Sequence, residues 1–101
     1  NRNAGLAERR LVSVSSQRII RETMRRFNVS DINYVKPGIA EATRTLLRRR
    51  PDAICLGNKS DPDLSHLYHL ADAKQVQVCP VPENSPYRAI AIINARAQEL
   101  I

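Results

Sequence analysis

Apolar residues recur at helical spacing in three stretches of the chain. The first, residues 15–28, begins with serines of the kind that cap helix starts, and the second, residues 39–49, lies between a proline-glycine pair and a later proline. The third, residues 61–74, starts with aspartate and proline, which suit the N-cap and the first helical position. The positions predicted to face inward are Ile19, Ile20, Met24 and Phe27, then Ile39, Ala42, Leu46 and Leu47, then Leu64, Leu67, Tyr68 and Ala71.

Four shorter stretches have the patterns of β-strands. Residues 53–57 (AICLG) are continuously apolar, which is typical of a strand covered on both faces, whereas residues 75–81 (QVQVCPV) alternate. Residues 31–35 (DINYV) alternate weakly, and residues 88–93 (RAIAII) form a further apolar strand. A short helix over residues 95–101 is expected to follow.

The order of these elements predicts the architecture. Helix, strand, helix, strand, helix, strand, strand and helix indicate an α/β fold, a three-layer α/β/α sandwich with a mixed four-stranded sheet. No repeat or linker divides the sequence, and its 101 residues suffice for one domain with a modest core. We therefore expect a single domain over residues 15–101, preceded over residues 1–14 by a basic segment, either an extended arm or a first short helix.

The charge adds a functional expectation. The chain carries 16 Lys and Arg against 10 Asp and Glu, a net charge of +6 and a pI near 10.0. Such an excess favours a nucleic-acid partner through phosphate neutralisation and counterion release, although a membrane surface or an acidic protein would satisfy it as well. No apolar run approaches the roughly 20 residues of a membrane-spanning helix, so an integral membrane protein is not expected.

The residues that carry reactive side chains do not predict an enzyme. Cys55 and Cys79 lie inside apolar runs and are predicted to be buried, reduced thiols of an intracellular protein. His66 and His69 have no third ligand at suitable spacing, so no metal site is expected; His66 should be partly buried and hydrogen-bonded, and His69 exposed. A glycine-rich phosphate loop and a Ser-His-Asp order are both missing from the sequence. We expect no catalysis, no cofactor and no small-molecule substrate.

Features that suit an anion gather around the predicted helix 39–49. Its proline-glycine start leaves the N–H groups of the first turn pointing outward, where the helix dipole attracts negative charge. Glu41, in that turn, either offsets the dipole or accepts a hydrogen bond from a base amino group. The bases of the helix and its flanks form a track that is either a solvated face or a binding face: Lys36, Arg44, Arg48, Arg49 and Arg50.

The segment "VKPGIAEATRTLLRR…AICLGNKSDPDLSHLYHLADAKQVQVCPVP" resembles the kink-turn RNA-binding family, which includes archaeal-type and eukaryotic large-subunit ribosomal proteins and core proteins of box C/D and H/ACA small nucleolar ribonucleoproteins. That family has a glycine, then Asn-Glu, then Thr-Lys at the start of its second helix. Its order of elements agrees with the predicted α/β/α fold. The matching residues here are Gly38, Glu41, Thr43 and Arg44.

Two departures from the family concern base recognition. Ala40 stands where the family's asparagine reads a guanine of the kink-turn, so direct readout is lost at that point. The loop between the last two strands is shortened to "PENSPYR", where Tyr87 could stack on a base. The resemblance therefore implies a retained grip on phosphates, since phosphate contacts position an RNA without specifying its sequence.

Together these observations predict a non-catalytic RNA-binding structural subunit of a large ribonucleoprotein. The expected particle is a ribosome, including an organellar one; the alternatives are a small nucleolar or RNase P/MRP-type particle, or a protein-interaction module on the same fold. The expected partners are structured RNA and neighbouring proteins of an intracellular particle, with no membrane and no metal. The predicted RNA-binding residues are Lys36, Gly38, Ile39, Ala40, Glu41, Arg44, Arg48, Tyr87 and Arg88.

Overall fold

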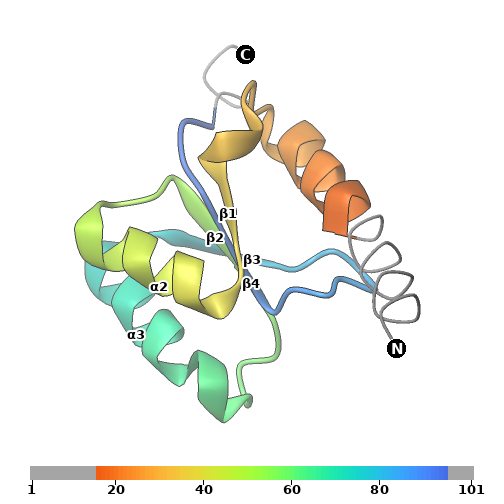
Figure 1. Cartoon of the computed structure of the whole chain (residues 1–101). Helices are drawn as coiled ribbons and strands as arrows, with labels where there is room; N and C mark the ends of the chain where they lie inside the picture. The colour runs from red at the N-terminus through yellow and green to blue at the C-terminus, as the bar shows by residue number, and fades with distance from the viewer. Residues whose placement is uncertain (1–15, 96–101) are drawn as a thin grey trace, which may run out of the picture.

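A computed structural model describes residues 16–95 of the chain (Figure 1). A first helix covers residues 16–27 of this range, and a single 3-10 turn follows it before the sheet begins. The remaining elements are the 3-10 turn Ile32–Tyr34, β1 (Val35–Pro37), α2 (Ile39–Arg48), β2 (Ala53–Leu56), the 3-10 turn Pro62–Leu64, α3 (Ser65–Lys74), β3 (Gln77–Pro80) and β4 (Ala89–Ile92).

The four strands form one mixed sheet in the order β1-β4-β2-β3. β2 and β3 are parallel, with Cys55 opposite Cys79, whereas β4 is antiparallel to both of its neighbours, β1 and β2. β4 comes last along the chain and nevertheless occupies an interior place, so β1 and β3 are the edges. The mixed four-stranded sheet predicted from the sequence is confirmed.

Helices cover both faces of the sheet and make three layers. α2 and α3 lie on one face, and helix 16–27 lies on the other (Figure 1). The side chains of β4 alternate accordingly, because Ala89 and Ala91 belong to the core cluster under α2 and α3, while Ile90 and Ile92 pack with Ile19 of helix 16–27. The α/β/α sandwich is therefore confirmed.

Two predicted elements differ from the structure. The helix predicted over residues 61–74 begins as the 3-10 turn Pro62–Leu64, which Asp61 caps, and becomes α-helical only at Ser65. The weakly alternating stretch 31–35 is not a strand over its length, because its middle forms the 3-10 turn Ile32–Tyr34. The Asp31 carboxylate accepts a hydrogen bond from the Asn33 N–H at 2.9 Å, and this local bond favours a turn over strand pairing. Pairing with β4 begins only at Val35.

Two side chains lie further out than predicted. Leu47 is 64% exposed, because Ala42 and Leu46 take the inward face of α2 and Leu47 follows one helical step, about 100°, beyond it. His66 is exposed rather than partly buried, although it does make the predicted hydrogen bond: its Nε2 lies 2.8 Å from the Thr43 hydroxyl oxygen and links α3 to α2. His69 is exposed, as predicted.

Two other predictions fall outside the part of the chain that the structure describes. The basic segment 1–14 precedes it, and all but the first residue of the predicted helix 95–101 follows it. Among residues 16–95, no helix has both the length and the apolar character that crossing a bilayer requires.

Candidate nucleic-acid interface

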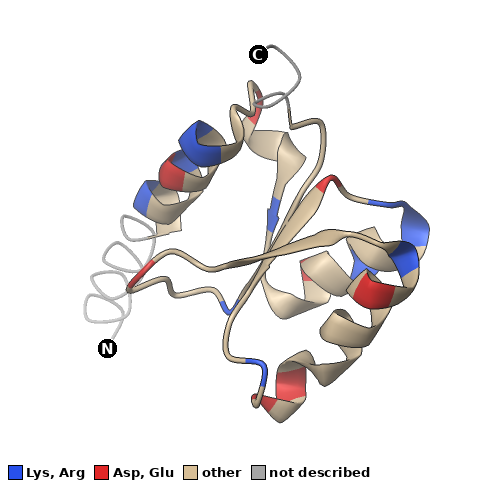
Figure 2. Cartoon of the chain, turned by 180° about the vertical axis from the view of Figure 1, so that it is seen from behind, with Lys and Arg blue, Asp and Glu red and all other residues tan. Residues whose placement is uncertain are grey.

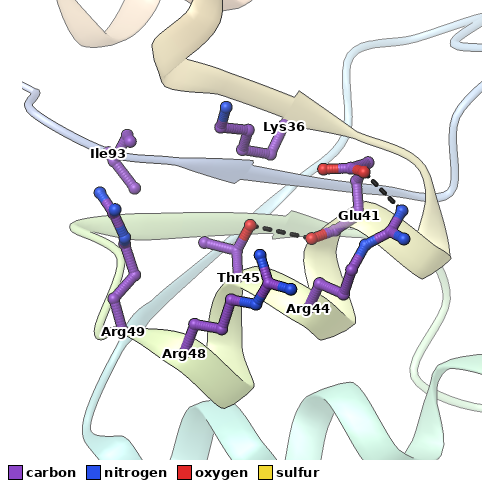
Figure 3. A pocket seen from close by; sticks show the side chains of 7 residues that line it. All are labelled: Lys36, Glu41, Arg44, Thr45, Arg48, Arg49 and Ile93. Carbon is purple, nitrogen blue, oxygen red and sulfur yellow. Dashed lines mark hydrogen bonds and ion pairs between the residues drawn. The ribbon is translucent and has the colours of Figure 1, made fainter.

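An open groove of about 350 Å³ lies between the edge strand β1 and helix α2 (Figure 3). Val35 of β1 is buried on the face of helix 16–27, so the next residue, Lys36, projects toward α2. No strand lies beyond β1 among the described residues, which leaves the groove accessible from the side. Its lining residues are Lys36, Glu41, Arg44, Thr45, Arg48, Arg49 and Ile93.

The charges of the groove follow from the way α2 is oriented. Ala42 and Leu46 are fully buried against the sheet, and this fixes Glu41, Arg44 and Arg48 on the flank that borders β1. Four cationic side chains thus line one groove together with a single carboxylate. The structure brings four of the nine predicted site residues together here: Lys36, Glu41, Arg44 and Arg48.

That carboxylate is paired with one of the bases. The Arg44 guanidinium donates a hydrogen bond of 2.5 Å to Glu41 Oε1, and both side chains remain about half exposed (Figure 3). An ion pair in such a wet position is worth roughly 0–1 kcal/mol, so a phosphate can compete for Arg44. Glu41 therefore holds Arg44 against the helix surface when no anion is bound.

The helix start next to the groove depends on Gly38. This residue has φ = 97° and ψ = 151°, a backbone conformation that is essentially restricted to glycine. Its N–H donates to the Ala89 carbonyl at 2.8 Å, which ties the start of α2 to β4. Gly38 provides no side-chain cap, and Ala40 in the first turn is exposed, while Ile39 packs partly against the core.

Arg88 lies outside the groove and is already engaged by two acids. Its guanidinium donates hydrogen bonds of 2.9 Å to Asp61 Oδ2 and 3.0 Å to Asp63 Oδ2, both in the segment that follows β2. The hydrogen bond to Asp63, followed by that to Asp61, raises the pKa of Arg88 above its ordinary value. The structure does not place Arg88 with the other predicted phosphate contacts.

Tyr87 also lies away from the groove. It packs partly against the core cluster beneath helix 16–27, on the opposite face of the sheet from α2. The Ser85 hydroxyl accepts a hydrogen bond from the Tyr87 N–H at 3.0 Å and donates one to the Tyr87 carbonyl at 2.8 Å, which closes a tight local turn. The predicted stacking residue is thus half-buried and held by its own loop.

Three residues of the groove were missing from the predicted site. Arg49 belonged to the predicted basic track but was not selected, and Thr45 follows Glu41 by one helical turn, a spacing that could have identified it. Ile93 had no local signal, because it reaches the groove only through the pairing of β4 with β1. Arg50, also in the predicted track, donates instead to the backbone carbonyls of Lys74 and Gln75, both at 2.8 Å.

Both cysteines are free and buried, as predicted. The pKa of the Cys55 thiol is raised to about 11, chiefly by burial and then by the neighbouring Cys79, while Arg26 opposes the shift. Since the thiolate is the reactive form of cysteine, Cys55 is held in its unreactive state at neutral pH.

An α/β/α domain with four cationic side chains in a groove at the edge of its sheet has the features of a polyanion-binding protein. Comparison with known families is consistent with this class. Residues 6–95 match the family of the PELOTA RNA binding domain. The chain belongs to this family, and the predicted RNA-binding fold is confirmed at that level.

One relative adds a different activity. Over 79 residues the chain is 39% identical to a protein of Acinetobacter baylyi named "Cysteine protease StiP". The matched segment covers 77% of this chain and 21% of that protein, so the chain spans about a fifth of its relative's length.

The expectation of a non-catalytic protein is therefore wrong. A relative with 39% identity over most of the chain carries the name of a protease. No reactive pair of side chains in the sequence of this chain indicates the activity that the relative's name reports.

Proposed function

We propose that this domain binds the phosphate backbone of RNA in the groove between β1 and α2. The observation that carries the proposal is the convergence of Lys36, Arg44, Arg48 and Arg49 on one open groove that follows α2 from Glu41 to its C-cap Arg49. Each nucleotide brings one negative charge, and neutralising phosphates releases condensed counterions. Membership in the Pelota RNA-binding family supports RNA as the polyanion.

Recognition in this groove would rest on shape and charge rather than on base sequence. Arg44 and Arg48 can each present a planar fork to a phosphate. Ala40, exposed in the first turn of α2, offers no polar side-chain atom to a base. Glu41 is the one carboxylate in the groove that could accept a hydrogen bond from a nucleobase amino group.

We also propose that the domain brings RNA binding to a protein with cysteine protease activity. The support is the name of the relative, together with the fact that the chain matches about a fifth of that relative. In such a protein the thiol chemistry would lie apart from the RNA groove, because Cys55 is fully buried and its pKa is raised.

The narrower proposal is that the bound RNA is a structured RNA of an intracellular ribonucleoprotein particle. The motif resemblance around Gly38, Glu41 and Arg44 supports it. Substituting Ala40→Asn should raise affinity for a generic kink-turn RNA if the groove keeps the geometry of that family. An unchanged affinity, measured against a matched straight duplex, would count against kink-turn recognition and leave backbone binding intact.

Salt dependence of RNA binding tests the main proposal. Fluorescence anisotropy with a labelled RNA hairpin should give a linear fall of log affinity with log salt. Replacing Lys36→Gln together with Arg48→Gln should reduce that slope by about 1.4–1.8, since each lost phosphate contact removes roughly 0.7–0.9. The control is Lys59→Gln, which removes an exposed positive charge outside the groove. Equal slopes for the wild type and the double variant would reject the groove.

A further inference from the structure

A second basic surface lies on the opposite side of the sheet from the groove. Figure 2 shows positive and negative residues along helix 16–27. The helix carries four arginines and one glutamate, and all five residues are exposed. Arg26 is engaged locally, because its guanidinium donates to the Pro80 carbonyl at 3.1 Å and lies 5.3 Å from the centre of the Phe27 ring. The other three arginines are exposed: Arg18, Arg21 and Arg25.

These three arginines form one stripe that we call the helix stripe. They follow each other at i, i+3 and i+7, so they share a face of the helix and rise about 10 Å along it. None of the ion pairs between described residues includes them. Glu22 lies beside the stripe, and Glu83 borders a shallow hollow that also contains Arg18, yet neither acid comes within ion-pair distance in the described part of the chain.

The arginines of the stripe repel one another, and Glu22, four residues after Arg18 and three before Arg25, offsets only part of that repulsion. Like charges at i, i+3 and i, i+4 repel, and Arg21 and Arg25 are such a pair. A polyanion placed along the stripe would remove the repulsion and exchange condensed counterions for guanidinium contacts. The stripe consists of arginine alone, and the planar arginine fork fits phosphate oxygens in pairs.

The packing of the helix argues against a membrane as the partner of this face. A helix that lies on a lipid surface needs an exposed apolar side. Here Ile19 and Phe27 are buried in the core cluster shared with Ile90 and Ile92, so the apolar side faces the sheet. The exposed side offers positive charge without apolar area.

We propose that the helix stripe binds a second segment of RNA backbone, so that one domain bridges two RNA segments across its sheet. The inference rests on the proposed RNA binding in the groove. α2 covers one face of the sheet and helix 16–27 the other, so the groove and the stripe address opposite sides of the molecule. A short RNA duplex is a stiff rod and cannot bend around the domain to reach both.

The stoichiometry of binding to a 12-base-pair RNA hairpin tests the proposal with the full chain. Native mass spectrometry should show complexes of one protein with two hairpins. Two variants lose three positive charges each, from different faces. The stripe variant is Arg18→Gln, Arg21→Gln and Arg25→Gln, and the groove variant is Lys36→Gln, Arg44→Gln and Arg48→Gln. Each should stop at one hairpin, and the stripe variant should keep its remaining affinity within about threefold of the stronger wild-type step.

A bridging assay gives the second readout. Beads that carry one biotinylated hairpin should retain a fluorescent hairpin only through wild-type protein, and circular dichroism should show both variants folded. A wild-type limit of one hairpin, a stripe variant that still binds two, or bridging through a two-protein complex would overturn the proposal. If the wild type binds one hairpin and only the groove variant loses it, bridging fails while the proposed groove stands. If the wild type binds one hairpin and only the stripe variant loses that binding, both the bridging proposal and the groove assignment fail.

Discussion

Arg50, which follows α2, caps the C-terminal end of α3, and Lys74 of α3 caps the C-terminal end of α2. The Arg50 guanidinium donates hydrogen bonds of 2.8 Å to the carbonyls of Lys74 and Gln75 at the end of α3. The Lys74 ammonium in turn donates to the carbonyls of Leu46 and Arg49 at the end of α2. Both cations satisfy carbonyls that a helix end leaves without partners, at the negative end of the dipole. The exchange fixes the two helix ends side by side.

Neighbouring arginines should therefore respond in opposite ways to the same substitution. Arg50→Gln removes two charge-assisted hydrogen bonds and should lower the free energy of unfolding by about 1–2 kcal/mol, with no change in the salt slope of RNA binding. Arg49→Gln should leave stability within roughly 0.5 kcal/mol and lower the slope by about 0.7–0.9. Chemical denaturation and anisotropy measure the two quantities. A slope change for Arg50→Gln of the same size as that for Arg49→Gln would show that Arg50 is not confined to its cap.

Removing the acid of the groove should strengthen RNA binding. Glu41→Gln releases Arg44 from its ion pair and removes the one negative side chain of the groove, so affinity for an RNA hairpin should rise about two- to fivefold. Stability should fall by less than about 1 kcal/mol, since the pair is exposed and the carboxylate also favours the helix start. Asp72→Asn, an exposed acid of α3, controls for net charge. A loss of affinity would instead identify Glu41 as an RNA contact.

Alanine should destabilise the protein more at Gly38 than at Gly57, although there is more space around Gly38. A Cβ at Gly38 would meet nothing within 4 Å, yet φ is 97°, so Gly38→Ala should cost about 1–3 kcal/mol of stability. A Cβ at Gly57 would lie 3.4 Å from Leu64 Cδ1, an ordinary contact, and no such backbone strain applies. Gly57→Ala should cost less than Gly38→Ala in the same thermal denaturation series. The opposite order would mean that the start of α2 relaxes without strain.

The buried thiol of Cys55 should make stability fall at alkaline pH. Its pKa is about 11 in the folded chain against 9.0 for an ordinary thiol, so the unfolded chain loses the proton first. The stability contribution is complete below pH 9 and is lost as the pH rises toward 11, with an upper limit of roughly 2–3 kcal/mol. The free energy of unfolding, measured by urea denaturation between pH 8 and 11, should therefore fall less steeply with pH for Cys55→Ala than for the wild type. Parallel pH profiles would show that this thiol does not contribute.

Local patterns in the sequence predicted the layers of the fold, and non-local contacts account for what they missed. The apolar run Ala53–Leu56 and the spacing of Ala42 and Leu46 are properties of single elements, so their burial could be inferred directly. The place of Arg88 beside Asp61 and Asp63 depends on residues 25 and 27 positions away, and no periodicity encodes it. For the same reason the sequence does not distinguish Arg49 from Arg50. The two residues are adjacent, yet Arg49 lines the groove and Arg50 caps α3.

The interior position of β4 in the sheet determines when the domain can complete its folding during synthesis. Among the described residues β1 pairs only with β4, and β4 also lies between β1 and β2. A nascent chain that has left the ribosome only as far as β3 therefore has a two-stranded parallel pair and an orphan first strand. Cooperative closure must wait for residues 89–92, because contacts over long sequence separations form late and expose edges while they wait. Lys36 and Ile93 share the groove only after that last strand is inserted, so anion binding can report completion of the fold.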